Sequence, residues 1–131
     1  MSMIAALTLA VAAQGAGQGA IVVVAPPETE FDVGYAELMA GHDQEAVDAI
    51  EKCRKLAKDD PARLLNHGIA LARLGRYDHA RADFEAAASF ENRIELETST
   101  GKWVDSRVLA HRALAMLDSG DFARYYALSM R

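Results

Sequence analysis

The side chains best suited to acid–base or metal chemistry are few in this chain, and their spacing does not match a known site. The histidines are His42, His67, His79 and His111, and the single cysteine is Cys53. Metal-binding and catalytic histidines usually recur at short fixed intervals or converge with acidic partners, as in an HExxH helix. None of these four belongs to such a motif. We therefore expect no metal site, with a catalytic or ligating histidine as the alternative.

Two other motifs have suitable residue types in the wrong context. Asp59-Asp60 directly precedes Pro61, which favours the start of a helix over an acid pair. Ser99-Thr100-Gly101-Lys102 ends in Gly-Lys but lacks the upstream glycine of a phosphate-binding loop. The sequence therefore predicts no enzyme, no catalytic residue and no cofactor.

Composition points to one small globular domain that does not bind nucleic acid. The 131 residues carry 14 Lys and Arg against 19 Asp and Glu, a formal net charge of −5, and 51% of them are hydrophobic. Basic and acidic side chains are interleaved, so no basic face is available for a phosphate backbone. The single cysteine excludes an intramolecular disulfide.

The first 27 residues contain no charged side chain. Met3 to Ala13 has the length of a signal-peptide core, is too short to span a bilayer as a helix, and is followed by small residues suited to cleavage. We expect residues 1–20 to be a signal peptide, residues 21–30 a flexible lead-in, and the protein to be exported, to the periplasm in a bacterium. The run Ile21–Val24 is a candidate short strand that ends at Pro26-Pro27. Because no Lys or Arg precedes the apolar run, a cytoplasmic protein with an N-terminal helix is the alternative.

The rest of the chain contains an internal repeat with a period of 34 residues. Shifting the sequence by that interval aligns Gly34 with Gly68, Ala36 with Ala70, Gly41 with Gly75, Ala46 with Ala80 and Glu51 with Glu85. Each unit has the pattern of two amphipathic helices around a glycine turn.

The helix boundaries of the second unit follow from capping chemistry. Asp60 suits an N-cap and Pro61 the first helical position. Gly75 is expected to end this helix in the left-handed conformation. Asp78 opens the next helix, and Asp43 has the same role in the first unit.

The residues Gly68, Ala80, Phe84 and Ala87, with the turn "LGRYDHA" from Leu74 to Ala80, resemble the tetratricopeptide repeat family. The first unit retains Gly34, Gly41 and Ala46, has Ile50 and Cys53 at the last two positions, and departs from the pattern at Glu37. The resemblance implies an all-α fold of stacked antiparallel helix pairs, with units at about 31–60 and 61–92 in a domain spanning 31–131.

The resemblance also assigns packing roles. The residues expected to form the contacts between helices are Gly34, Ala46, Ile50, Gly68, Leu71, Tyr77, Ala80, Phe84 and Ala87. His67 falls at an inward position, so a buried, hydrogen-bonded imidazole is expected. Cys53 replaces an interhelical alanine and is expected to be a buried small residue, with a reactive thiol as the alternative.

An insertion separates the second unit from the third. Ile94 and Leu96 alternate with charged residues, and a Thr-Ser-Thr-Gly turn precedes Lys102-Trp103-Val104, which predicts a β-hairpin within residues 93–105. An ordered loop is the alternative. Trp103 is expected to cover the end of the second helix pair, with stacking on a ligand as the other possibility.

The last segment, residues 106–131, is expected to supply a third helix pair that acts as a cap. Ser106 is a candidate N-cap, and Gly120 ends the first helix. Tyr125 stands where the family places a small residue, so the final helix is interpreted as a capping helix rather than half of a full repeat.

The family resemblance implies a non-enzymatic protein–protein interaction module that binds a protein or peptide in the groove lined by the first helix of each unit. The residues expected in that groove are Phe31, Tyr35, Leu38, Met39, Leu65, Ile69, Arg73 and Leu114. One alternative is that N-terminal residues or the hairpin fill the groove. Another is a self-associating, homo-oligomeric or structural subunit of a larger envelope assembly.

Overall fold

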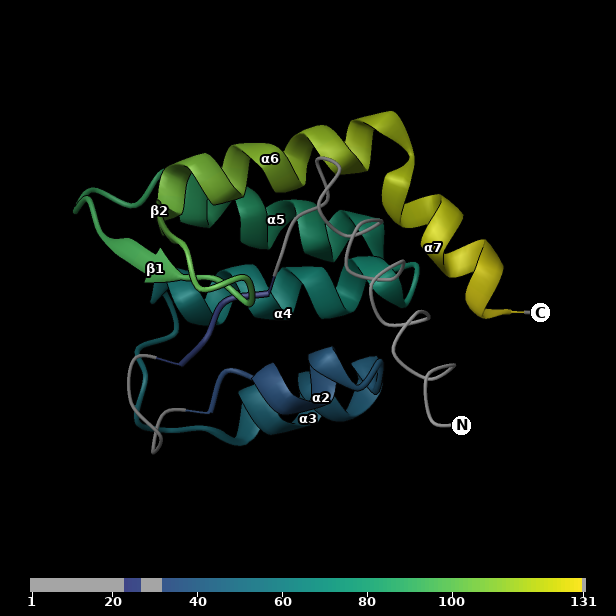
Figure 1. Cartoon of the computed structure of the whole chain (residues 1–131), viewed down its shortest axis with the longest axis horizontal. Helices are drawn as coiled ribbons and strands as arrows, with labels where there is room; N and C mark the ends of the chain where they lie inside the picture. Colours follow the sequence, from purple (N-terminus) through teal and green to yellow (C-terminus); the bar gives the residue numbers. More distant parts are fainter. Residues whose placement is uncertain (1–22, 27–31, 131) are drawn as a thin grey trace, which may run out of the picture.

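The computed structural model describes residues 23–26 and 32–130, which form six helices and one two-stranded antiparallel sheet (Figure 1). The elements in chain order are α2 (Tyr35–Met39), α3 (Asp43–Lys52), α4 (Pro61–Arg73), α5 (Tyr77–Ala88), β1 (Glu95–Glu97), β2 (Trp103–Asp105), α6 (Ser106–Ser119) and α7 (Asp121–Ser129). The expectation of a mostly helical chain with a small hairpin is confirmed. The predicted signal peptide and Phe31 lie outside the described residues. No helix in the described part is both long and apolar enough to cross a membrane.

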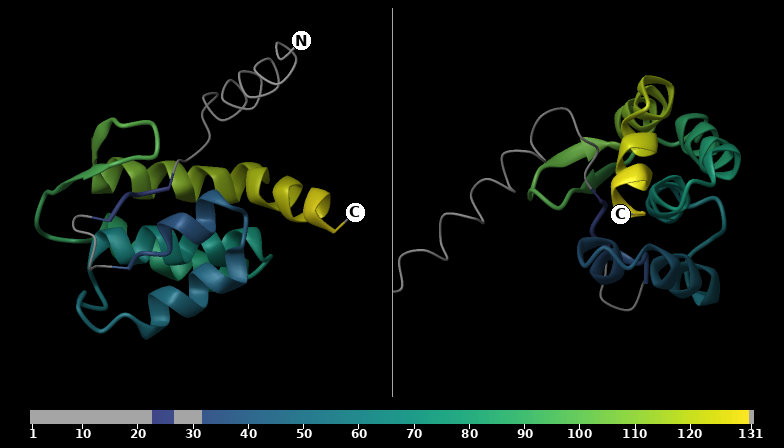
Figure 2. Two further views of the ribbon diagram at one scale, coloured as in Figure 1. Left: turned by 60° about the horizontal axis from the view of Figure 1, so that its bottom comes forward. Right: turned by 90° about the vertical axis from the view of Figure 1, so that its right-hand side faces the viewer.

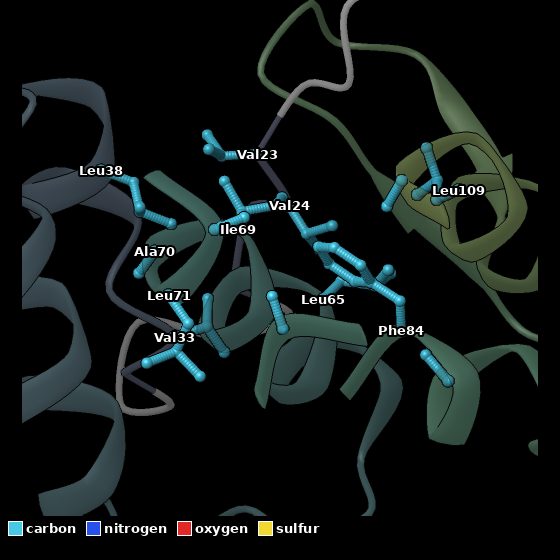
Figure 3. Packing of buried hydrophobic residues seen from close by; sticks show 14 of the residues in the cluster. Val23, Val24, Val33, Leu38, Leu65, Ile69, Ala70, Leu71, Phe84 and Leu109 are labelled. Atoms are coloured by element: carbon cyan, nitrogen blue, oxygen red, sulfur yellow. The ribbon is translucent and has the colours of Figure 1, made fainter. Parts of the chain in front are cut away.

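Helix α4 lies at the centre of the molecule. Nine of its thirteen residues are buried, and it packs against α2, α3, α5, α6 and α7. Apolar side chains from these helices meet around Leu65, Ile69 and Phe84, as Figure 3 shows. The core therefore forms around one helix that is enclosed on nearly every side.

The two turns that the 34-residue repeat predicts have the same backbone geometry. Gly41 and Gly75 both have φ +79°. The residues after them, His42 and Arg76, have φ −90° with ψ 71° and 68°. The hydrogen bonds match as well, because the His42 N–H donates to the Glu37 carbonyl and the Arg76 N–H donates to the Leu71 carbonyl. The left-handed conformation predicted for Gly75 is confirmed, and Gly41 in the first unit has it too.

Small residues bring the helices of each pair together, as predicted. A Cβ built on Gly68 would lie 2.5 Å from Cε1 of Phe84, so only glycine permits this contact between α4 and α5. A Cβ on Gly34 would lie 3.0 Å from Cδ1 of Ile50. The buried packing residues of the two units are Gly34, Ala46, Ile50, Gly68, Leu71, Ala80, Phe84 and Ala87, while Tyr77 is half-buried against the core.

The first helix of the first unit is much shorter than its counterpart. Gly34 aligns with Gly68, which lies inside α4, but Gly34 is the N-cap of α2 with φ +67°. The Asp32 carboxylate accepts a hydrogen bond from the Gly34 N–H at 2.8 Å and so forms a turn before the helix begins. The departure of the first unit from the repeat pattern therefore extends beyond Glu37 to the helix start itself.

Two aspartates cap the long helices α4 and α6. Asp60 accepts a hydrogen bond from the Ala62 N–H, and Asp105 accepts one from the Arg107 N–H. The Asp60 cap and Pro61 at the first helical position are as predicted. The prediction that Ser106 caps α6 is wrong: Ser106 is the first helical residue and is fully buried, because the carboxylate one position earlier reaches the free N–H groups.

The insertion forms the predicted hairpin. β1 pairs with β2 in the register Glu95–Asp105, Leu96–Val104 and Glu97–Trp103. The turn is closed by hydrogen bonds between Thr98 and Lys102. The expected role of Trp103 is wrong, since 63% of this side chain is exposed. Leu96 and its pairing partner Val104, which face the other side of the hairpin, pack on the core.

Candidate protein-interaction surface

The face formed by α2, α4 and α6, on which the groove was expected, is largely covered in this structure. Leu38, Leu65 and Ile69 are buried core residues, so the prediction that they line an open groove is wrong for these three. Tyr35 and Leu114 are half-buried and pack against the core. Arg73 is mostly buried, and among the groove residues that the structure describes only Met39 is well exposed. Two segments of the same chain cover the face.

The first covering segment is the strap, defined here as residues 23–26. The Ala25 N–H donates to the Glu97 carbonyl at 2.8 Å, and the Ser99 N–H donates to the Val23 carbonyl at 2.9 Å. Val24 forms an antiparallel bridge with Thr98. The strap is therefore an extended segment that pairs through one bridge with the end of β1 and the residues after it. This part of the face is filled by N-terminal residues, as in one of the alternatives for the groove.

Asn66 holds the other edge of the strap. Its Oδ1 accepts from the Val24 N–H at 2.8 Å, and its Nδ2 donates to the carbonyls of Val24 at 2.7 Å and Val33 at 2.9 Å. All three bonds are buried, and Asn66 is 0% exposed. Sequence reasoning gave Asn66 no role, although an uncharged amide between Leu65 and Ile69 on an apolar face needs partners of both kinds.

The second covering segment is α7. In the right-hand view of Figure 2 it lies on the side of α4 away from α3 and α5. Phe122 anchors it, because this ring is buried and stacks on Phe84 with centroids 6.1 Å apart. The final helix therefore covers α4 as well as α6, which the interpretation as an end cap did not anticipate.

A polar cluster fastens α7 to the two helix pairs. The Arg73 guanidinium lies 5.1 Å from the centre of the Tyr125 ring and donates to the Leu38 carbonyl at 3.0 Å. Arg73 also reaches Asp43 at 3.4 Å, and the Tyr125 hydroxyl donates to the same carboxylate at 3.3 Å. Burial raises the pKa of Asp43, and Arg73 and Tyr125 oppose this shift. Arg73 was predicted to face a partner but is engaged inside the chain.

His67 joins the two helix pairs through two carboxylates. Its Nδ1 lies 2.6 Å from Oδ2 of Asp83 on α5, and its Nε2 lies 2.8 Å from Oε2 of Glu51 on α3. The hydrogen bond to Asp83 is the main cause that raises the pKa of His67, burial acts against it, and Glu51 adds to the increase. The expected hydrogen-bonded imidazole is present, although it is half-buried and bridges two charges.

The remaining chemical candidates do not converge. Cys53 is half-buried at the end of α3, in contrast to the buried position expected for it. Burial raises the pKa of its thiol, but backbone hydrogen bonds at Lys55, Leu56 and Asp32 outweigh this and lower it overall. Within residues 23–26 and 32–130, no group of three or more His, Cys, Asp and Glu side chains is placed to hold a metal ion.

Large apolar side chains are exposed at the end of α2 and along α7, two elements that Arg73 of α4 contacts. Met39 is 56% exposed, Leu128 is 62% exposed and Met130 is 70% exposed, with Tyr125 also exposed beside them on α7. Met39 follows Leu38, whose carbonyl binds the same guanidinium that contacts Tyr125. We call Met39, Tyr125, Leu128 and Met130 the C-terminal edge.

Comparisons of this chain with protein-family models, with curated proteins and with solved structures found no match.

Proposed function

We propose that this chain is a non-enzymatic helical-repeat module of the tetratricopeptide type that binds another protein through its C-terminal edge. The exposed apolar side chains of that edge are the observation on which the proposal rests. Exposed large apolar side chains on the surface of a small domain can mark interaction sites, and three of these four lie within six residues of one another at the end of α7. The matching turns at Gly41 and Gly75 support the repeat architecture.

The chemistry of the edge favours a partner segment with apolar anchors. Tyr125 and Leu128 are three positions apart on α7 and so lie on one side of that helix. The methionines are unbranched and adapt to irregular surfaces, which suits a site that receives a helix or an extended segment. The Arg73 guanidinium lies against the Tyr125 ring and holds this ring at the border of the surface.

The interface can be tested with charged substitutions in the full chain. Leu128→Asp and Met39→Asp should each abolish capture of the partner from extracts of the native host, while the far-UV circular dichroism spectrum stays unchanged. Val108→Asp is the matched control, because Val108 is an exposed apolar residue on α6 away from the C-terminal edge. If Val108→Asp loses the partner and the other two variants retain it, the interface lies on α6 and the proposal is wrong.

Self-association is the second candidate function. The observation that favours it is that α7 is the last described helix and leaves Leu128 and Met130 uncovered, where a further helix pair would pack in a longer stack. Light scattering after size-exclusion chromatography distinguishes the two functions. A wild-type dimer that becomes monomeric with Leu128→Asp supports self-association, and a wild-type monomer at high concentration excludes it.

We also propose export of the protein, which rests on the apolar run from Met3 to Ala13. Cleavage should place the mature N-terminus between Ala12 and Ile21. The intact mass of the protein purified from its native host tests this, and a full-length mass from the cytoplasm would contradict it.

A further inference from the structure

We propose that the strap occupies a recognition site for extended peptide segments, and that a partner's segment with two consecutive β-branched residues binds there by displacing the strap. This site is formed by the outer edge of β1, the Thr98–Ser99 turn and Asn66. It is separate from the C-terminal edge and does not depend on the function proposed for that edge.

The hydrogen bonds show why the site would accept a segment from another protein. In an extended chain, the N–H and C=O of successive residues point to opposite edges. At Val23 and Ala25 the strap bonds to Ser99 and Glu97, and at Val24 it bonds to Asn66. The strap thus lies between residues 97–99 at the end of β1 on one side and the Asn66 side chain on the other.

Every one of these hydrogen bonds involves main-chain atoms of the strap. Binding of this kind, in which an extended segment adds to a sheet edge, obtains its affinity from the backbone and its selectivity from side-chain pockets. The pockets here hold Val23 and Val24, which are 2% and 1% exposed. The ligand class is therefore an extended segment with two adjacent apolar, β-branched residues, the second of which must carry an N–H for Asn66.

The site also requires an occupant. Without one, the Asn66 amide would lose its two bonds to Val24 in a buried setting, and the Glu97 carbonyl and the Ser99 N–H would lose their partners. The strap satisfies both needs from within the chain. An intramolecular segment has a high effective concentration. The strap therefore lowers the apparent affinity of any competing segment for the site, but it does not prevent binding.

The test uses the full chain with a weakened strap. In Val24→Ser the strap keeps its backbone but loses one apolar anchor, so the site is more accessible. The probe is a synthetic peptide with the sequence Ile21 to Pro27, preceded by two lysines for solubility. We expect this peptide at millimolar concentration to raise the melting temperature of Val24→Ser by several degrees and that of the wild type by less.

A second peptide tests the role of Asn66. Replacing the residue that corresponds to Val24 with proline removes the N–H that Asn66 accepts, and binding should weaken about tenfold. No rise in melting temperature for a folded Val24→Ser variant would overturn the proposal. Equal binding of the two peptides would also overturn it.

A measurement on the wild type covers the case in which Val24→Ser does not fold. The side-chain amide resonances of Asn66 should shift on addition of the valine peptide and stay in place with the proline peptide. Unchanged resonances with both peptides would refute the site. The proposal is also contradicted if the wild type is a dimer and its Asn66 resonances do not shift when the peptide is added. That result would mean that the strap of a second copy occupies the site.

Discussion

The first helix pair (α2 and α3) and the second (α4 and α5) share a turn but differ in their first helix. Their glycine turns agree in backbone angles and hydrogen bonds, and in each pair a glycine lies against a large side chain 16 positions later. Yet α2 has five residues and α4 has thirteen. A few local residues are enough to reproduce a turn, whereas the length of a helix depends on what precedes the glycine and on its neighbours.

The short first helix of the first pair leaves a place for the strap to bind. Val33 stands at the position equivalent to His67, but it precedes α2 and its carbonyl accepts a hydrogen bond from Asn66. In a longer first helix, that carbonyl would bond within the helix. Asn66 therefore binds Val24 and Val33 together, because the first helix pair is incomplete.

The largest expected effect comes from removing the side chain that each glycine contacts. Phe84→Ala should lower the free energy of unfolding by about 3–5 kcal/mol, because a fully buried ring between Gly68 and Phe122 is lost. Ile50→Ala leaves a smaller cavity at the equivalent place and should cost about 2–4 kcal/mol. Urea denaturation measures both values. A larger loss for Ile50→Ala would mean that the core is centred on the first pair.

A smaller loss of unfolding free energy is expected when the glycines are replaced by alanine, and the cause differs between the two pairs. Gly68→Ala and Gly34→Ala should each cost about 1–3 kcal/mol. At Gly68 the cause is overlap with Phe84 within a helix, so adding Phe84→Leu should recover part of the loss. At Gly34 the φ of +67° remains unfavourable for alanine, so adding Ile50→Val should recover little.

Gly41→Ala is the matched control for this comparison. Its φ is +79°, and a Cβ at this position would meet nothing within 4 Å. Gly41→Ala should therefore show the cost of backbone strain alone, and it should lower the free energy of unfolding by less than Gly34→Ala does. Double-mutant cycles measured by thermal unfolding provide the comparison, and equal recovery at Gly34 and Gly68 would contradict it.

The smallest expected change in unfolding free energy comes from His67, which connects the two helix pairs through Glu51 and Asp83. The folded state raises the pKa of His67 above its ordinary value of 6.5, so the protonated imidazole stabilises the fold. This stabilisation is complete below about pH 6.5 and is lost as the pH rises through the folded pKa. The difference in unfolding free energy between the wild type and His67→Gln should thus shrink between about pH 6 and pH 9.

Chemical denaturation at the two pH values tests the link. The charged residues that line the same pocket as His67 are Glu51, Asp83, Lys58 and Arg63, and all four are kept in His67→Gln. The raised pKa of Asp43 is common to both proteins and cancels in the difference. A difference that is constant with pH would show that folding leaves the pKa of His67 unshifted, and a difference that grows with pH would show that folding lowers it.

The sequence by itself determined the features that depend on residues close together in the chain. The start of α4 at Asp60-Pro61, the turns at Gly41 and Gly75, and the hairpin within residues 93–105 follow from capping, glycine conformation and side-chain alternation. The close approach of Gly68 and Phe84 also followed, because a repeated pattern of small and large residues identifies which helix faces meet.

Only the tertiary structure decided what covers each apolar face. Periodicity places Leu65 and Ile69 on one side of α4, but it cannot tell whether a partner, the strap or α7 lies against that side. Trp103 was expected to cover the second helix pair for a similar reason. Alternation shows that the hairpin has two faces, but it does not show which face packs on the helices. The strap meets Asn66 across 42 positions, and Tyr125 meets Asp43 across 82. Contacts over such distances depend on how whole elements pack, because no short-range preference of the chain favours one covering segment over another.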